Sequence, residues 1–85
     1  MNLYLYLFTD PNVQREKVTE YLNTQQNVNF WFYSLPESIF IKTTLTARQL
    51  SDLLEAKFGK HRHIVVKVTE ERWGRLPKDH WQYFP

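Results

Sequence analysis

The feature that most constrains the fold is the order in which two hydrophobic patterns follow one another along the chain. Apolar residues that alternate with a period of two indicate a strand, and apolar residues three or four positions apart indicate a helix. The expected strands are residues 3–8, 28–35, 38–44 and 64–69, and the expected helices follow Asp10-Pro11 and Thr46. The order strand, helix, strand, strand, helix, strand predicts one sheet covered by helices, an α+β domain.

Local residues mark the ends of several elements. Asp10-Pro11 is typical of a helix start, because Asp accepts hydrogen bonds from free amides and Pro is preset for the first helical position. Pro36-Glu37 marks the turn of a hairpin. Thr46 and Gln49 have the spacing of a capping box, and Gly59 stands where a left-handed cap should end the second helix.

The order βαββαβ is that of the ferredoxin-like arrangement, an antiparallel sheet with both helices on one face. Its strand order, four-one-three-two, puts the first and third strands at the centre. We expect the helix-free face to be aromatic and to need a cover. Its expected residues are Tyr4, Tyr6, Phe8, Phe40 and either Trp31 with Tyr33 or Phe30 with Phe32.

Composition limits the class of protein. A chain of 85 residues with 42% hydrophobic and 24% charged residues forms one domain, residues 1–85. The absence of cysteine excludes disulfides and thiolate metal sites, and no cofactor is expected. The start Met1-Asn2-Leu3 lacks the layout of a signal peptide, and no apolar run is long enough for a membrane helix, so we expect a cytoplasmic protein with no membrane partner.

Aromatic residues make up 16% of the chain, more than so small a core can enclose. We therefore expect a homodimer, with residues 70–85 folding back over the sheet or onto a second subunit. The residues expected at the interface are Tyr4, Tyr6, Phe8, Trp31, Tyr33, Phe40, Trp73 and Trp81.

The chain resembles the small SinR-like proteins, which are related to virulence-associated protein D and to the small CRISPR-associated subunit of spacer integration. The resemblance covers most of the chain after residue 28. It rests on Phe30-Trp31-Phe32-Tyr33-Ser34-Leu35, Ser38-Ile39-Phe40-Ile41, Leu45-Thr46-Ala47, Ile64-Val65-Val66-Lys67-Val68 and Leu76-Pro77-Lys78-Asp79-His80-Trp81. It implies a ferredoxin-like homodimer packed partly through its sheets.

The same resemblance implies an acidic residue at the end of the first strand, which in nuclease-active members would bind a divalent metal at the dimer interface. Asp10 is the candidate here, but it follows Phe8-Thr9 and precedes Pro11, so it is displaced toward the helix. We expect an N-cap at Asp10, and a metal ligand is the alternative.

The histidines offer a second candidate metal site. His61 and His63 have strand spacing, and His80 could supply a third nitrogen ligand, although the neighbouring Lys60 favours a solvated turn. Other pairings have simpler explanations. A hydrolase triad from Ser34, His80 and Asp52 lacks a nucleophile motif, and Glu70 with Glu71 are expected to be solvated charges at a strand end.

Cations form a candidate binding edge toward the C-terminal half of the chain. Its members are Lys57, Lys60, Arg62, Lys67, Arg72 and Arg75. Such a run can track phosphates, and aromatic residues on a sheet of this type can stack bases. The net charge of only +2 favours a protein partner over nucleic acid.

Taken together, the sequence predicts a small dimeric, non-catalytic binding protein that acts through protein or nucleic-acid contacts, within CRISPR or mobile-element biology. Two alternatives stay open. One is a metal-dependent endonuclease, like active members of the resembled family. The other is a counter-defence factor from a mobile element that occupies a partner's surface.

Overall fold

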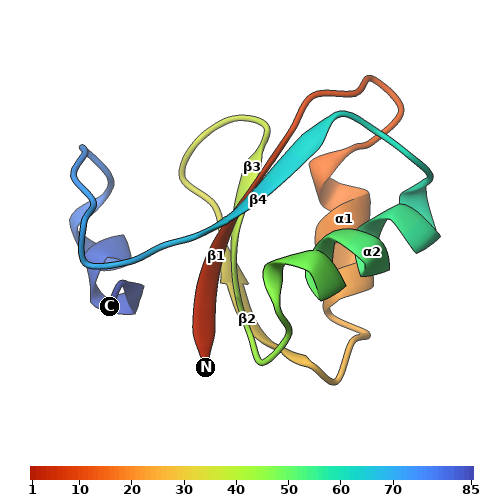
Figure 1. The fold of residues 1–85 in the computed structure, drawn as a ribbon. Helices are drawn as coiled ribbons and strands as arrows, with labels where there is room; N and C mark the ends of the chain where they lie inside the picture. The colour runs from red at the N-terminus through yellow and green to blue at the C-terminus, as the bar shows by residue number, and fades with distance from the viewer.

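The computed structural model describes residues 1–85 and contains four strands, two α-helices and a C-terminal 3-10 helix (Figure 1). The strands are β1 (Asn2–Phe8), β2 (Val28–Phe32), β3 (Ser38–Thr43) and β4 (His63–Lys67). The helices are α1 (Arg15–Leu22), α2 (Ala47–Phe58) and the 3-10 helix η1 (Lys78–Tyr83). The expected βαββαβ order is confirmed.

The sheet is antiparallel, with the order β2-β3-β1-β4, which is the expected order read from the opposite edge. Leu5 of β1 lies opposite Phe40 of β3 on one side and opposite Val66 of β4 on the other. Both helices lie on one side of the sheet (Figure 1). The fold is therefore α+β and compatible with the ferredoxin-like arrangement.

The first helix begins later than predicted. It starts at Arg15, and the residue before it, Gln14, makes no side-chain cap. The expectation that Asp10 is the N-cap is wrong, because its carboxylate accepts from the Asn12 amide at 2.8 Å and closes a tight turn instead. The turn residues Asp and Pro therefore precede the helix by several positions and do not open it.

The second helix begins as its capping box predicts. The Thr46 hydroxyl accepts from the Gln49 amide at 3.1 Å, and the Gln49 side chain accepts from the Thr46 amide at 2.9 Å. Gly59 ends the helix with a φ of 81°, which favours glycine, although its ψ of 171° lies outside the left-handed helical region expected for the cap.

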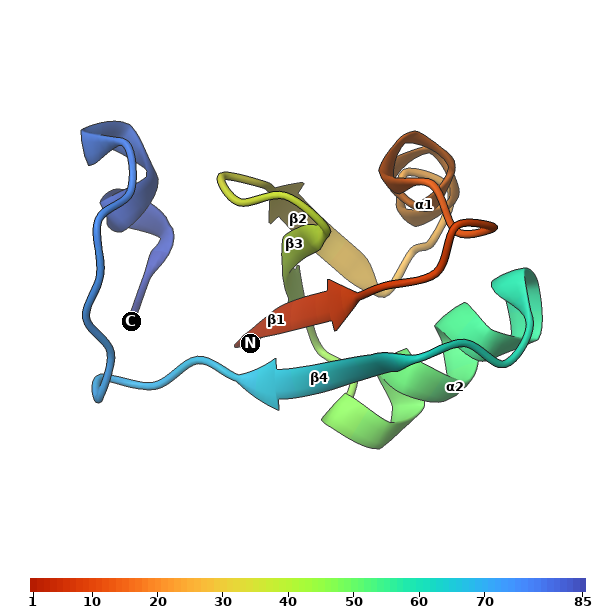
Figure 2. The ribbon, with the colours of Figure 1, turned by 90° about the horizontal axis from the view of Figure 1, so that it is seen from above.

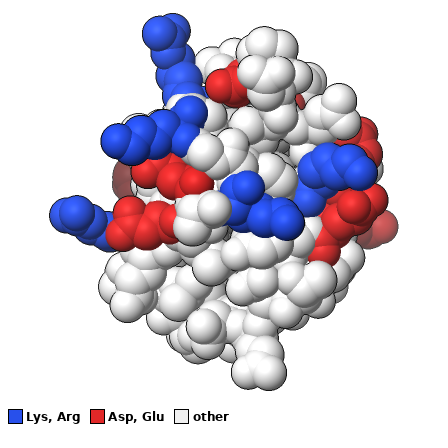
Figure 3. Space-filling view, turned by 90° about the vertical axis from the view of Figure 1, so that its right-hand side faces the viewer, with Lys and Arg blue, Asp and Glu red and all other residues white.

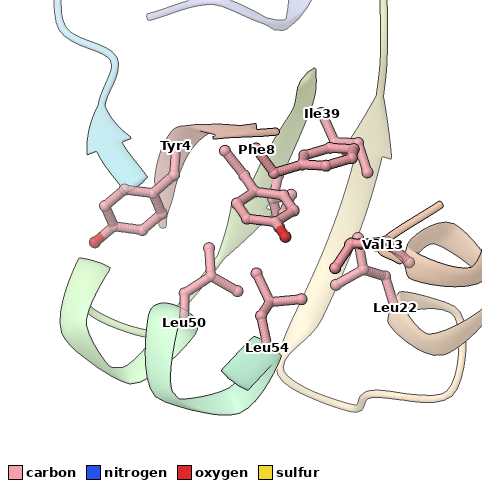
Figure 4. Packing of buried hydrophobic residues seen from close by; sticks show 10 residues of the cluster. Tyr4, Phe8, Val13, Leu22, Ile39, Leu50 and Leu54 are labelled. Atoms are coloured by element: carbon pink, nitrogen blue, oxygen red, sulfur yellow. The ribbon is translucent and has the colours of Figure 1, made fainter. Parts of the chain in front are cut away.

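The main core lies between the sheet and the helices (Figure 4). Tyr4, Tyr6 and Phe8 point into it and pack with Leu50 and Leu54 of α2. The expectation that these three aromatic residues lie on the helix-free face is wrong. Both sides of β1 are apolar, so alternation alone did not distinguish the side that meets the helices.

A second, smaller cluster lies on the helix-free face. It is built on Leu3, Phe32 and Phe40, which are buried under the C-terminal tail, residues 68–85. Phe40 is therefore on the face predicted for it, as are Phe30 and Phe32 of the two alternatives for β2. Figure 2 shows the tail on the side of the sheet away from α1 and α2.

Aromatic contacts hold the tail in place. Tyr83 packs on Phe30 and Phe32 with ring centroids 4.6 and 5.1 Å away, and Phe84 packs on Phe40 at 5.1 Å. Within one chain, these contacts place the tail over the sheet. None of the helices is long and apolar enough to cross a membrane.

Candidate functional site

One end of the helix-free face stays open, because the tail covers only the other end. Leu7, Ile64 and Val66 are 38%, 53% and 39% exposed there, and β1 and β4 place them side by side, with Leu7 directly opposite Ile64. We call these three residues the uncovered strip. Adjacent exposed apolar side chains on a sheet indicate a contact surface more strongly than scattered ones do.

The strip borders a free strand edge. Val68 donates its N–H to the Leu3 carbonyl, and Thr9 donates to the Arg62 carbonyl. Bonded pairs alternate in an antiparallel ladder, so residues 62, 64, 66 and 68 face β1. The backbone N–H and C=O groups of His63, Val65 and Lys67 consequently point away from the sheet, and we call them the β4 edge.

A shallow depression continues the strip toward the β2–β3 turn. It is lined in part by Leu7, Ile64, Arg62, Pro36 and Glu37. Glu37 has a φ of 55°, a region that Gly or Asn adopts more readily than Glu, so the turn holds some backbone strain. The carbonyl of Glu37 accepts from the Phe8 amide at 3.1 Å, which joins the turn to the end of β1.

The predicted basic edge is divided among several segments. Lys57 lies in the last turn of α2, Lys60 and Arg62 lie in the loop that follows, Lys67 ends β4, and Arg75 lies in the tail. On the face shown in Figure 3, basic side chains are interspersed with acidic ones. A continuous phosphate-binding stripe is not present on that face.

Arg72 serves the tail itself. Its guanidinium donates to the carbonyls of Glu70 and Pro85 at 3.0 and 2.5 Å and lies 5.9 Å from the centre of the Phe84 ring. These contacts tie the start of the tail to its end. Arg72 is therefore engaged within the chain, unlike Arg62 and Lys67, which form no ion pair.

His61 and His63 lie on the same side of the chain, with their rings stacked 4.4 Å apart. Every ring nitrogen has a partner. The Nε2 atoms contact the Tyr6 hydroxyl at 2.6 Å and the Ser51 hydroxyl at 2.7 Å, and both Nδ1 atoms lie 2.8 Å from backbone carbonyls. The pair thus ties β1 and α2 to the start of β4, and no group of three candidate metal ligands exists.

Tyr6 connects this histidine pair to the core. Burial, followed by the nearby charge of Asp10, raises the pKa of the Tyr6 phenol well above its ordinary value. The neutral phenol is therefore the form that the fold stabilises. Asp10 acts on this group through its charge while its carboxylate closes the turn.

The three residues considered for a hydrolase triad do not assemble. Ser34 and His80 contact each other and join the hairpin to the tail, with the His80 ring 5.2 Å from that of Phe32. Asp52 is on α2, where its exposed side chain pairs with Arg48 at 3.8 Å. The Ser34–His80 contact has no acid to orient the imidazole, and it holds the tail in place.

The remaining predicted interface residues are spread over different surfaces. The alternative that put Trp31 and Tyr33 on the helix-free face is wrong, because Trp31 lies opposite Ile41 and packs against the main core. The Trp31 and Tyr33 rings stack 6.3 Å apart, and the Arg15 guanidinium lies 3.7 Å above the Tyr33 ring. Trp81 packs on Phe84 at 4.9 Å, and Trp73 is 99% exposed in the tail. Trp73 is the only one of the three tryptophans whose side chain is fully exposed.

The uncovered strip was missed at the level of sequence. Ile64, Val65 and Val66 form a continuous apolar run, so the sequence does not indicate which of their side chains lie on the helix-free face. Comparisons of this chain with protein-family models, curated proteins and solved structures gave no match.

Proposed function

We propose that this protein is a non-catalytic, cytoplasmic binding protein that contacts another protein through the uncovered strip. The observation that carries the proposal is the exposure of Leu7, Ile64 and Val66 beside a free strand edge, while the rest of the same sheet face is covered by the tail.

The chemistry of the surface favours protein over nucleic acid. The uncovered strip is aliphatic, whereas base stacking requires exposed aromatic rings on the sheet. Phe32 and Phe40 on this face are buried beneath Tyr83 and Phe84, and the partly exposed Phe30 packs against Tyr83 with ring centroids 4.6 Å apart.

The residues that could form a homodimer interface are fewer than the sequence predicted. Its original basis was an aromatic sheet face, but Tyr4, Tyr6 and Phe8 are in the core and Phe40 is under the tail. A second copy would have to use the strip, whose exposed area is small compared with the roughly 800 Å² per partner of a stable interface. The area of the strip alone does not distinguish a second copy from a different protein, and the charges along the neighbouring strand edge are considered below.

The nuclease alternative has little support from the geometry. The ring nitrogens of His61 and His63 all contact hydroxyls or carbonyls, and one carboxylate oxygen of Asp10 closes a turn. The counter-defence alternative agrees with a protein that works by covering a partner's surface. The resemblance to SinR-like proteins is the basis for placing the protein in CRISPR or mobile-element biology, and this placement stays a prediction.

Photo-crosslinking in a nuclease-treated lysate of the native host tests the proposal. A benzophenone amino acid at Ile64 should yield a covalent adduct with a protein, and Val66→Lys in the same chain should abolish it. The control places the benzophenone at Arg48, a more accessible position on α2, whose side chain is 90% exposed compared with 53% for Ile64. The same adducts at both positions, or none at Ile64, would contradict the proposal.

A further inference from the structure

The backbone N–H and C=O groups of the β4 edge are not used in the hydrogen bonding of the sheet. β4 is hydrogen-bonded to β1 alone and ends the sheet (Figure 2). The N–H and C=O groups of His63, Val65 and Lys67 point outward, as the alternation of the ladder requires. Extended peptides bind such an edge by adding a strand, with the backbone giving affinity and the side chains specificity.

The side chains along this edge have a defined order. On the helix-free face Arg62, Ile64 and Val66 follow one another, and on the helix face Lys67 ends the strand. The edge is therefore apolar in its middle and positive at both ends. The nearest acidic residues in the sequence, Glu70 and Glu71, lie beyond the end of the strand.

Neither terminal cation of this edge is neutralised within the chain. Arg62 lines the same depression as Glu37, but no ion pair joins them. Lys67 likewise has no acidic partner. Both charges are exposed and free to attract carboxylates of another chain.

We propose that the partner docks by adding an extended acidic segment to the β4 edge as a fifth strand. The segment runs antiparallel to β4. Its six residues are, in order, acidic, apolar, unrestricted, apolar, unrestricted and acidic. The two acids lie opposite Lys67 and Arg62, and the two apolar residues lie opposite Val66 and Ile64. This inference rests on the proposed function and specifies the chemistry of the partner.

A second copy of the chain fits this edge poorly. Antiparallel pairing of two β4 strands about Val65 would put Lys67 of each copy opposite His63 of the other and would supply no carboxylate within the strands. Positive charge on an edge strand is a common device against pairing with an identical edge. No stretch of the sequence has the order acid, apolar, any, apolar, any, acid.

Charge reversal tests the proposed chemistry. The probe is a labelled synthetic peptide with the core Asp-Val-Thr-Val-Thr-Glu, compared by fluorescence anisotropy with a peptide carrying Lys at both acidic positions. The native protein should bind the acidic peptide at least tenfold more tightly, and Arg62→Glu with Lys67→Glu should reverse the preference. Lys17→Glu with Arg48→Glu, a matched charge change on the helices, should leave it unchanged.

A second measurement tests the docking mode. Binding of the acidic peptide should slow hydrogen exchange at the Val65 and Lys67 amides, which face the free edge. Val65→Pro removes one of these N–H groups without removing a bond to β1, so it should weaken peptide binding at least tenfold. Val65→Thr is the control, and circular dichroism verifies that each variant is folded.

Several results would overturn the inference. These are equal affinity for both peptides, protection confined to other amides, or protection of the β4 edge without peptide in a sample that sediments as a dimer. Loss of RNA binding in the charge-reversal variant, without peptide selectivity, would also overturn it. A protein adduct at Ile64 without peptide selectivity rejects the added strand alone, whereas the absence of that adduct rejects the proposed function.

Discussion

Replacing Phe84 with Ala should release the end of the C-terminal tail from the sheet. The Phe84 ring lies 5.1 Å from Phe40, 5.9 Å from Phe32 and 4.9 Å from Trp81, measured between ring centroids. It therefore links the tail to two strands, and its loss removes contacts on both sides of the small cluster.

The expected cost follows from partial burial. Truncating a fully buried Phe to Ala costs about 3 to 5 kcal/mol, part of which comes from the cavity left behind. Phe84 is only half-buried, and the tail can collapse onto the space, so we expect a loss of about 2 kcal/mol. For a domain of this size, that corresponds to a fall in Tm of roughly 8 to 16 °C.

Urea denaturation followed by tryptophan fluorescence and far-ultraviolet circular dichroism measures this loss. The matched control is Trp73→Ala in the same tail, which should leave stability unchanged because Trp73 is 99% exposed. A Phe84→Ala variant as stable as the native protein would refute the docked tail, and with it the reason why only one end of the sheet face is open.

Three further changes test the structure. Tyr6→Phe removes the hydrogen bond to His61 and should cost about 1 kcal/mol at neutral pH. Because burial, then the Asp10 charge, raises the pKa of Tyr6, its neutral form stabilises the fold below about pH 10, and this contribution is lost as the pH rises further. Urea titrations should therefore show a smaller alkaline loss of stability in Tyr6→Phe, and an unchanged profile would contradict the assignment. Asp10→Asn should keep the turn, whereas Asp10→Ala should lower the melting temperature; equal effects would mean that the acceptor is unimportant. Thr46→Ala should cost about 1 kcal/mol of unfolding free energy through the lost cap of α2, and a neutral result in chemical denaturation would count against the capping box.

Local patterns in the sequence were sufficient to predict the elements and their order. Hairpin residues Pro36-Glu37 and the capping box at Thr46 act within a few positions, so their effect is readable without the rest of the fold. The sheet order then followed from the βαββαβ sequence of elements, which permits few topologies. The turn at Asp10 was less readable, because Asp-Pro suits both a tight turn and a helix start.

Only the tertiary structure decided which side of β1 faces the helices. Leu3, Leu5 and Leu7 alternate with Tyr4, Tyr6 and Phe8, and either set is apolar enough to form a core. The choice depends on how α2 and α1 fit against the rings and on the hydroxyl of Tyr6 reaching His61, a residue 55 positions away.

The open part of the sheet face was decided in the same way. Tail residues Tyr83 and Phe84 cover Phe32 and Phe40 and leave Ile64 exposed. The β-branched run Ile64-Val65-Val66 predicts a strand, but the covering of its neighbours depends on contacts between segments about 45 residues apart in the chain. Such long-range packing is a property of the assembled fold, because it depends on shape and distance and not on local sequence pattern.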